Sequence, residues 1–183
     1  FYLDTAPLPD FTDIRFTQAD GQTSLPYFIE NVNGKKASRT AAVWLKIPEI
    51  PKEGLPIYIY YGNSKAADLS SAAAVFDFFD DFTANLNSAG WKVELESKDS
   101  LVSVSGSTLA IDAARVTTSA YKFYNGIIEY RAKMVANGGI ECIIIAGASR
   151  DEDLSAYSSI MAASAHCIVK NGKVLANYPK QIS

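Results

Sequence analysis

Hydrophobic and polar residues alternate with a period of two along most of this chain. Ile14 and Phe16 would share one face of a short strand. Asp13, Arg15 and Thr17 would share the opposite, polar face. Successive side chains of a strand point to opposite sides of the sheet, so this alternation predicts a strand with one buried face.

Turn residues divide the chain into further strands. Asp20-Gly21, Asn33-Gly34 and Asn171-Gly172 are dipeptides that favour hairpin turns. The first of them predicts that residues 25–30 pair back onto residues 13–17. Strands are also expected at residues 41–47, 57–61, 91–96, 101–104, 108–111, 115–118, 126–134, 140–145, 157–169 and 173–176.

One segment carries helix signals. Ser64 could cap a helix over residues 64–75, but the apolar face of that segment is thin. An extended connector between two domains is the alternative. Strands at this spacing, with almost no helix, predict an all-β protein.

An aromatic and acidic stretch at residues 76–82, FDFFDDF, marks the junction between two predicted domains. Its imperfect alternation predicts a strand with one buried face. Phe76, Phe78 and Phe82 would reach an apolar interior, and the aspartates would face water, a cation or a neighbouring domain. We expect one small β domain over residues 1–75 and a second over residues 76–183. The predicted fold class is therefore two β-sandwich or jelly-roll units in tandem, of which the second could be incomplete.

Composition limits the partners. The chain has 17 basic and 20 acidic residues and a net charge of −3, without the basic surplus that binding to nucleic acid requires. No segment reaches the ~20 apolar residues that span a bilayer. The chain begins on Phe1 within a predicted strand and shows no signal peptide, which indicates a processed product or a piece of a longer protein.

Four blocks of the first domain resemble the family called domain of unknown function 2341. They are DIRFTQADGQTSLPYFIE (13–30), VWLKIPEI (43–50), IYIYYGN (57–63) and FDFFDDF (76–82), in that order. The resemblance covers roughly residues 1–82. It implies a domain of bacterial and archaeal secreted or surface proteins, commonly followed by a concanavalin-A-like or laminin-G-like jelly roll.

The second domain is similar, over fewer residues, to that jelly roll. Trp91 follows the aromatic block, and YNGIIEYRAK at residues 124–133 is similar to the "G-x-x-E-x-R-x-K" strand of concanavalin-A-like glucanases and lectins. The resemblance implies a partial jelly roll over residues 76–183, because a full one has more strands than these residues supply.

The sequence lacks a pattern typical of catalysis. A retaining glycosidase on a jelly roll needs two carboxylates about 5–5.5 Å apart, from alternate positions of one strand. Glu141 stands alone in its predicted strand, and Asp151 and Asp153 share a face only in a predicted loop. His166, the only histidine, would point to the face opposite Cys167. We therefore expect a protein that is not an enzyme.

Carboxylates of the junction are candidate metal ligands. Asp77, Asp80 and Asp81 could supply oxygen atoms to Ca²⁺, which takes six to eight of them. Asp13 and Asp20 are weaker candidates. The alternative for all five is an ordinary solvated carboxylate, and no other cofactor is expected.

The two cysteines, Cys142 and Cys167, lie in separate predicted strands. A disulfide between them would close a loop of about 26 residues and stabilise the fold by roughly 3 kcal/mol. Two buried free thiols are the alternative. Their spacing matches no zinc site.

Aromatic residues supply the remaining signal for binding. Flat aromatic faces bind sugars with the help of polar side chains. The candidate ligand-binding residues are Tyr121, Tyr124, Tyr157 and Arg131. Trp44 and Trp91 are expected in the core instead.

These features favour a non-catalytic module of a secreted or cell-surface protein that binds carbohydrate or another surface ligand. One alternative is a structural subunit or spacer of a surface filament, adhesin or layer, completed by strand pairing between neighbouring copies. A degenerate glycoside hydrolase fragment is the third hypothesis.

Overall fold

The structure is a computed structural model that describes residues 8–35, 38–87, 90–118, 127–133, 142–146, 157–161, 165–170 and 173–179. In the last four of these ranges the backbone is described, and side chains only at Lys173 and Leu175. The chain forms two compact units, Phe1–Thr117 and Thr118–Ser183. The predicted domain boundary at residues 75/76 lies inside the first unit and stays a prediction.

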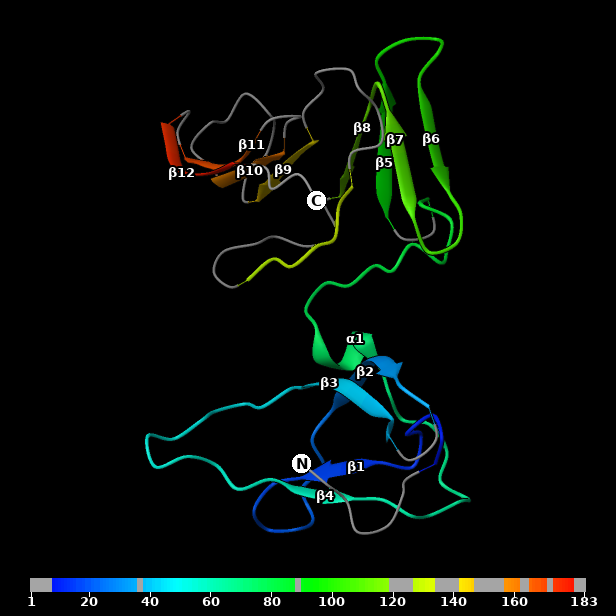
Figure 1. Ribbon diagram of the computed structural model, residues 1–183, viewed down its shortest axis with the longest axis vertical. Helices are drawn as coiled ribbons and strands as arrows, with labels where there is room; N and C mark the ends of the chain where they lie inside the picture. Colours follow the sequence, from blue (N-terminus) through cyan, green and yellow to red (C-terminus); the bar gives the residue numbers. More distant parts are fainter. Residues whose placement is uncertain are drawn as a thin grey trace. The chain divides into compact units, whose positions relative to one another are not determined.

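The described residues form twelve strands and one short helix (Figure 1), which confirms the all-β class. The strands are β1 (Arg15–Thr17), β2 (Tyr27–Asn33), β3 (Thr40–Leu45), β4 (Tyr58–Tyr60), β5 (Trp91–Leu95), β6 (Leu101–Val104), β7 (Leu109–Asp112), β8 (Ala114–Thr118), β9 (Cys142–Ala146), β10 (Tyr157–Met161), β11 (Ala165–Lys170) and β12 (Lys173–Pro179). The helix is α1 (Ala72–Val75).

The first unit is assembled from small sheets of two strands each. They pair β1 with β4, β2 with β3, β5 with β8 and β6 with β7. The predicted pairing of residues 25–30 with residues 13–17 is wrong except at its start, where Thr17 bridges Ser24. The turn brings the two segments together, but Phe16 pairs with Ile59 of β4, and Ile59 packs against the same core as Phe16.

The second unit contains one antiparallel sheet in the order β12-β11-β10-β9. The strand predicted at residues 126–134 is wrong over its described part, because residues 127–133 form no strand and are exposed. Period-two alternation is a local signal, whereas strand conformation also depends on pairing with a distant segment.

Only the end of the predicted helix over residues 64–75 is helical. Ser71, not Ser64, caps it, and its hydroxyl accepts from the Ala74 N–H at 3.3 Å. Before that point, side chains bond to nearby backbone: Asn63 accepts from the Lys65 N–H at 3.0 Å, and Asp68 accepts from the Ser70 N–H at 2.8 Å. Such local bonds offer the backbone an alternative to the helix.

The core of the first unit lies between the two sheets that β1–β4 and β2–β3 form. Ile14, Phe16, Leu25 and Tyr27 are its buried residues. The rings of Phe16 and Tyr27 meet edge to face with their centroids 5.5 Å apart. Partly buried side chains surround them, among them Phe11, Ile29, Val43, Leu45, Ile57, Ile59 and Tyr61.

Asp13 belongs to this core and not to a solvated face, which corrects the simple alternation of residues 13–17. It is 2% exposed. One carboxylate oxygen accepts from the Leu8 N–H at 2.8 Å and the other from the Gly62 N–H at 2.6 Å. A buried carboxylate persists where it is hydrogen-bonded in this way. Asp13 therefore ties two irregular segments to the start of β1.

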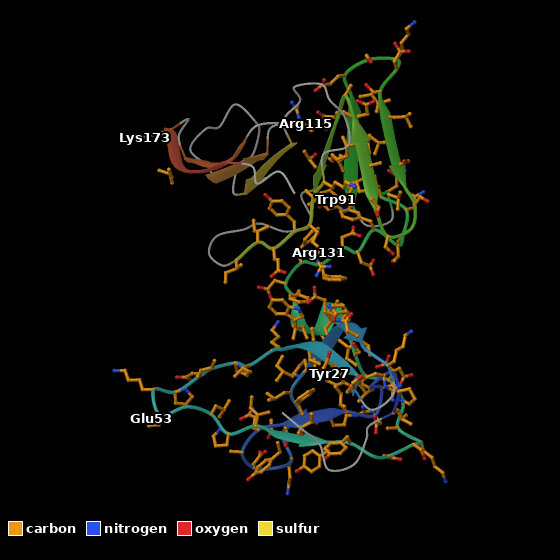
Figure 2. The ribbon with its side chains drawn as sticks, in the orientation of Figure 1. Tyr27, Glu53, Trp91, Arg115, Arg131 and Lys173 are labelled. Carbon is orange, nitrogen blue, oxygen red and sulfur yellow. The ribbon has the colours of Figure 1, made fainter. Side chains whose placement is uncertain are left out.

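Tyr27, labelled in Figure 2, forms a second polar contact with Arg15 at the edge of the core. The Arg15 guanidinium donates to the Tyr27 hydroxyl at 3.1 Å and to the carbonyl of Thr12 at 3.0 Å, and it also bonds the carbonyl of Ala67. Burial raises the pKa of the Tyr27 phenol above its ordinary value, and the charge of Arg15 partly offsets that rise.

Replacing Asp13 by alanine should lower the free energy of unfolding by about 2–4 kcal/mol, because two buried N–H groups lose a charged acceptor. Urea denaturation followed by circular dichroism measures the change. Asp10→Ala is the matched control, since the Asp10 carboxylate also accepts hydrogen bonds but is exposed. Equal losses of unfolding free energy in the two variants would show that the burial of Asp13 does not contribute to stability.

The raised pKa of Tyr27 predicts a loss of stability in alkali. Between the ordinary pKa near 10 and the raised value, the folded state holds a phenol proton that the unfolded state has released. The stabilisation is complete below that window and declines as the pH rises through it. In thermal melts from pH 9 to 11, the melting temperature should therefore fall less steeply with pH for Tyr27→Phe than for the wild type. Parallel curves would contradict this assignment.

Candidate functional site

The aromatic stretch at residues 76–82 covers the second face of the β2–β3 sheet. One face of that sheet meets the core, and the other carries Phe28 and Trp44, which are register partners. The Phe76 ring lies 5.9 Å from Phe28 and 5.4 Å from Trp44, edge to face in both cases. Phe79 stacks on Phe76 at 5.5 Å. The strand predicted over these residues is wrong: they form no strand and lie against the sheet through their aromatic side chains.

The same stretch also contacts the start of β5. Trp91 is the first residue of that strand (Figure 2). Its ring lies 5.7 Å from Phe78 and 6.0 Å from Phe82. Its indole N–H donates to an Asp80 carboxylate oxygen at 2.6 Å. Residues 76–82 therefore join β2–β3 to β5 within the first unit.

Each aspartate of this stretch has a different partner. Asp77 pairs with Lys46 at 3.4 Å on the surface. Asp80 bonds Trp91, and Asp81 accepts from the Thr83 hydroxyl at 2.7 Å. The part of the chain that the structure describes holds no group of three or more His, Cys, Asp or Glu side chains arranged for a metal ion. The structure does not bring Asp77, Asp80 and Asp81 together as a ligand set.

Asp20, the other exposed candidate ligand, organises its own turn. Its carboxylate accepts from the Gln22 and Thr23 N–H groups, both at 2.9 Å, and from the Thr23 hydroxyl at 2.5 Å. These bonds, first that of the Thr23 hydroxyl, lower the pKa of Asp20. The carboxylate therefore closes the loop between β1 and β2.

A short loop after the aromatic stretch, residues 83–87, is held against β5. Leu86 is 8% exposed. Its carbonyl accepts from the Trp91 N–H at 3.0 Å. Within the loop, the Asn85 side chain accepts from the Asn87 N–H at 2.9 Å. The loop is therefore fixed at its apolar centre, close to Trp91.

This loop forms one wall of an open cleft of about 640 Å³, and β5 and β6 form the rest. Its lining residues are Thr83, Ala84, Asn85, Leu86, Asn87, Val93, Leu95, Ser100, Leu101, Val102, Ser103 and Val104. They are hydroxyl, amide and aliphatic residues. None of these described lining residues carries an ionisable side chain. The volume lies within the ~300–1,000 Å³ of small-molecule sites.

A tight turn sets the far wall of the cleft. Strands β6 and β7 pair from Leu101↔Asp112 to Val104↔Leu109. Gly106 and Ser107 have φ of 55° and 56°, and positive φ at both central residues defines the type I′ turn, whose twist matches that of the paired strands. This hairpin holds β6 in register beside the cleft.

The structure does not test the ligand-binding residues predicted from sequence. Tyr121 and Tyr124 lie outside the described residues, as do Glu141, Asp151 and Asp153. Tyr157 begins β10, where its backbone pairs with Ala146 and Lys170. Arg131 is exposed in residues 127–133. Their assignment to a site stays a prediction.

Trp44 is more exposed than a core residue, at 39%. Its indole N–H donates to the Glu30 carboxylate at 3.0 Å. The alternation of β3 places Trp44 on the face opposite Val43 and Leu45, which pack on the core. The expectation of a core position for Trp44 is therefore wrong: its ring packs on Phe76, on the face of the sheet away from the core.

The strand order separates the two cysteines. Cys142 lies in β9 opposite Met161, and Cys167 lies in β11 opposite Ile160. Strand β10 lies between them, so their Cα atoms are two strand spacings apart, roughly 9.5 Å. A disulfide usually joins Cα atoms about 4.4–6.8 Å apart. The register favours the alternative of unpaired thiols.

Sequence reasoning missed the cleft because its lining residues are individually unremarkable. Serine, threonine, leucine and valine at strand positions indicate only a half-buried strand. The one available signal was the pair Asn85 and Asn87, which follows the aromatic stretch directly. Fold and site together define an all-β protein with an uncharged open cleft.

Residues 10–94 match the model of a family described as "Domain of unknown function (DUF2341)". The match confirms the resemblance of the first part of the chain, and it includes the aromatic stretch, the loop and most of β5. No curated protein and no solved structure matches the chain.

Among the described residues, no helix has the length and apolar character needed to cross a membrane.

Proposed function

We propose that this chain is a non-catalytic binding module that takes a neutral carbohydrate in the cleft between the 83–87 loop and strands β5 and β6. The observation that carries the proposal is the lining of the cleft. It combines amide and hydroxyl groups with aliphatic side chains and contains no ionisable group among its described residues.

This lining matches the chemistry of an uncharged sugar. Asn87 and Ser103 offer amide and hydroxyl groups of the kind that bond sugar hydroxyls. Val93, Leu95 and Leu101 offer aliphatic surface for the C–H groups of the ring. An acidic ligand would instead call for a cation, because an unpaired charge is costly to remove from water.

The same lining favours binding over hydrolysis. Glycoside hydrolysis uses two carboxyl groups, one on each side of the scissile bond. The described lining supplies neither an acid nor a base. We therefore place this module among carbohydrate-binding proteins and not among active hydrolases.

We further propose that the module is secreted or displayed on a cell surface, with a concanavalin-A-like jelly roll as its second domain. The resemblance of residues 13–82 to domain of unknown function 2341 supports this setting. The antiparallel sheet of β9 to β12 is compatible with a β-sandwich layer.

Leu101→Asp should weaken glycan binding about tenfold or more, because it adds a charge to a lining that otherwise has none. Leu101 is 62% exposed, so the substitution should leave the fold intact. A glycan array would identify neutral ligands, and calorimetry would give the Kd of each variant. Ile50→Asp is the matched control, since Ile50 is 69% exposed and outside the lining. Absence of binding to any glycan, or an equal Kd for Leu101→Asp and wild type, would refute the proposal.

A second candidate function is a structural subunit that associates through strand pairing. Strand β3 favours it, because in the described residues β3 pairs with β2 alone and its six residues, TAAVWL, carry no charge. Edge strands are normally protected by charges or proline. Sedimentation velocity over a hundredfold concentration range would decide: association that Ala42→Lys abolishes supports this candidate, and a monomer throughout excludes it.

A further inference from the structure

We infer that Asp80 is a positioning residue that preforms the cleft by clamping Trp91 and, through it, the 83–87 loop. The part of this inference that concerns a ligand rests on the proposed function. Asp80 is not among the lining residues of the cleft. It would therefore act on the ligand only through the groups that it holds in place.

Both carboxylate oxygens of Asp80 are used inside the protein. One accepts from the Trp91 indole N–H at 2.6 Å. The other accepts from the Phe82 N–H at 2.7 Å. Hydrogen bonds to an ionised acceptor are shorter and stronger than neutral ones. A single side chain thus joins the aromatic stretch to the first residue of β5.

Trp91 links Asp80 to the 83–87 loop, which forms one wall of the cleft. Its ring contacts Phe78 and Phe82, and its backbone N–H donates to the Leu86 carbonyl at 3.0 Å. Leu86 lines the cleft and is the buried centre of the loop. Loss of the Asp80–Trp91 contact would therefore alter the position of the loop through Trp91 alone.

The backbone between these residues needs the constraint. Phe82 has φ of 55°, in the left-handed region that bulky residues rarely adopt. Its N–H bond to Asp80 holds that conformation. Without the carboxylate, Phe82 would be free to relax to negative φ, and the loop that begins at Thr83 would change direction. A loop that is already ordered loses less conformational entropy when a ligand binds.

The experiment compares Asp80→Ala, Asp80→Asn and the control Asp77→Asn in the full chain. The Trp91 indole N–H resonance, assigned with Trp44→Phe, reports the contact without any ligand. We expect Asp80→Ala to shift this resonance upfield and to speed its exchange with water. Asp80→Asn retains one acceptor oxygen and should give an intermediate shift. Asp77→Asn should leave the resonance unchanged, because Asp77 pairs with Lys46.

The second readout is the Kd for the neutral glycan found on the array. We expect a Kd about tenfold higher for Asp80→Ala, partial rescue in Asp80→Asn and no change in Asp77→Asn. Trp91→Phe keeps an aromatic ring but removes the indole N–H donor, so it should reproduce the weaker binding if Asp80→Ala fails to fold. An unchanged Trp91 resonance in Asp80→Ala would overturn the inference, and so would a shifted resonance with an unchanged Kd. If the wild type binds no glycan, the proposed ligand is refuted. The Trp91 indole N–H resonance still tests the Asp80–Trp91 contact in that case.

Discussion

The fold of the first unit depends on covering both faces of very small sheets. A sheet of two strands is marginally stable in water unless another layer packs against it. The β2–β3 sheet meets the Ile14–Phe16–Leu25–Tyr27 core on one face. Its other face would expose Phe28 and Trp44, and the aromatic stretch at residues 76–82 packs there through Phe76 and Phe79. Contacts of these rings, together with those of Phe78 and Phe82 with Trp91, connect the strands before the stretch to β5.

Carboxylates stabilise the irregular backbone that such small sheets leave between them. Asp13 accepts from two backbone N–H groups in the core, Asp20 closes the turn after β1, and Asp80 joins Phe82 to Trp91. Each satisfies donors that no strand partner satisfies. The acidic residues that suggested a cation site therefore act as local acceptors. The cleft follows from one of these contacts, because the loop at residues 83–87 is held beside Trp91.

Much of the strand pattern could be predicted from the sequence, and the pairing could not. Residues 41–47, 57–61, 91–96 and 101–104 contain β3, β4, β5 and β6 almost to their ends. Period-two alternation reports a local property, so it locates a strand well. The partner of β1 depends on which distant apolar strand fits its buried face, and β4 lies about forty residues away. The cleft has no local signature either, because ordinary strand and loop residues line it.

The sequence by itself determined the all-β class and the position of most strands, since both depend on side chains close together along the chain. Tertiary structure alone decided that Asp13 is buried, that Trp44 is half exposed and that β10 separates the two cysteines. It also decided where the uncharged cleft lies. These features depend on which distant segments share a face, and the free energy that selects them comes from contacts between residues far apart in the chain.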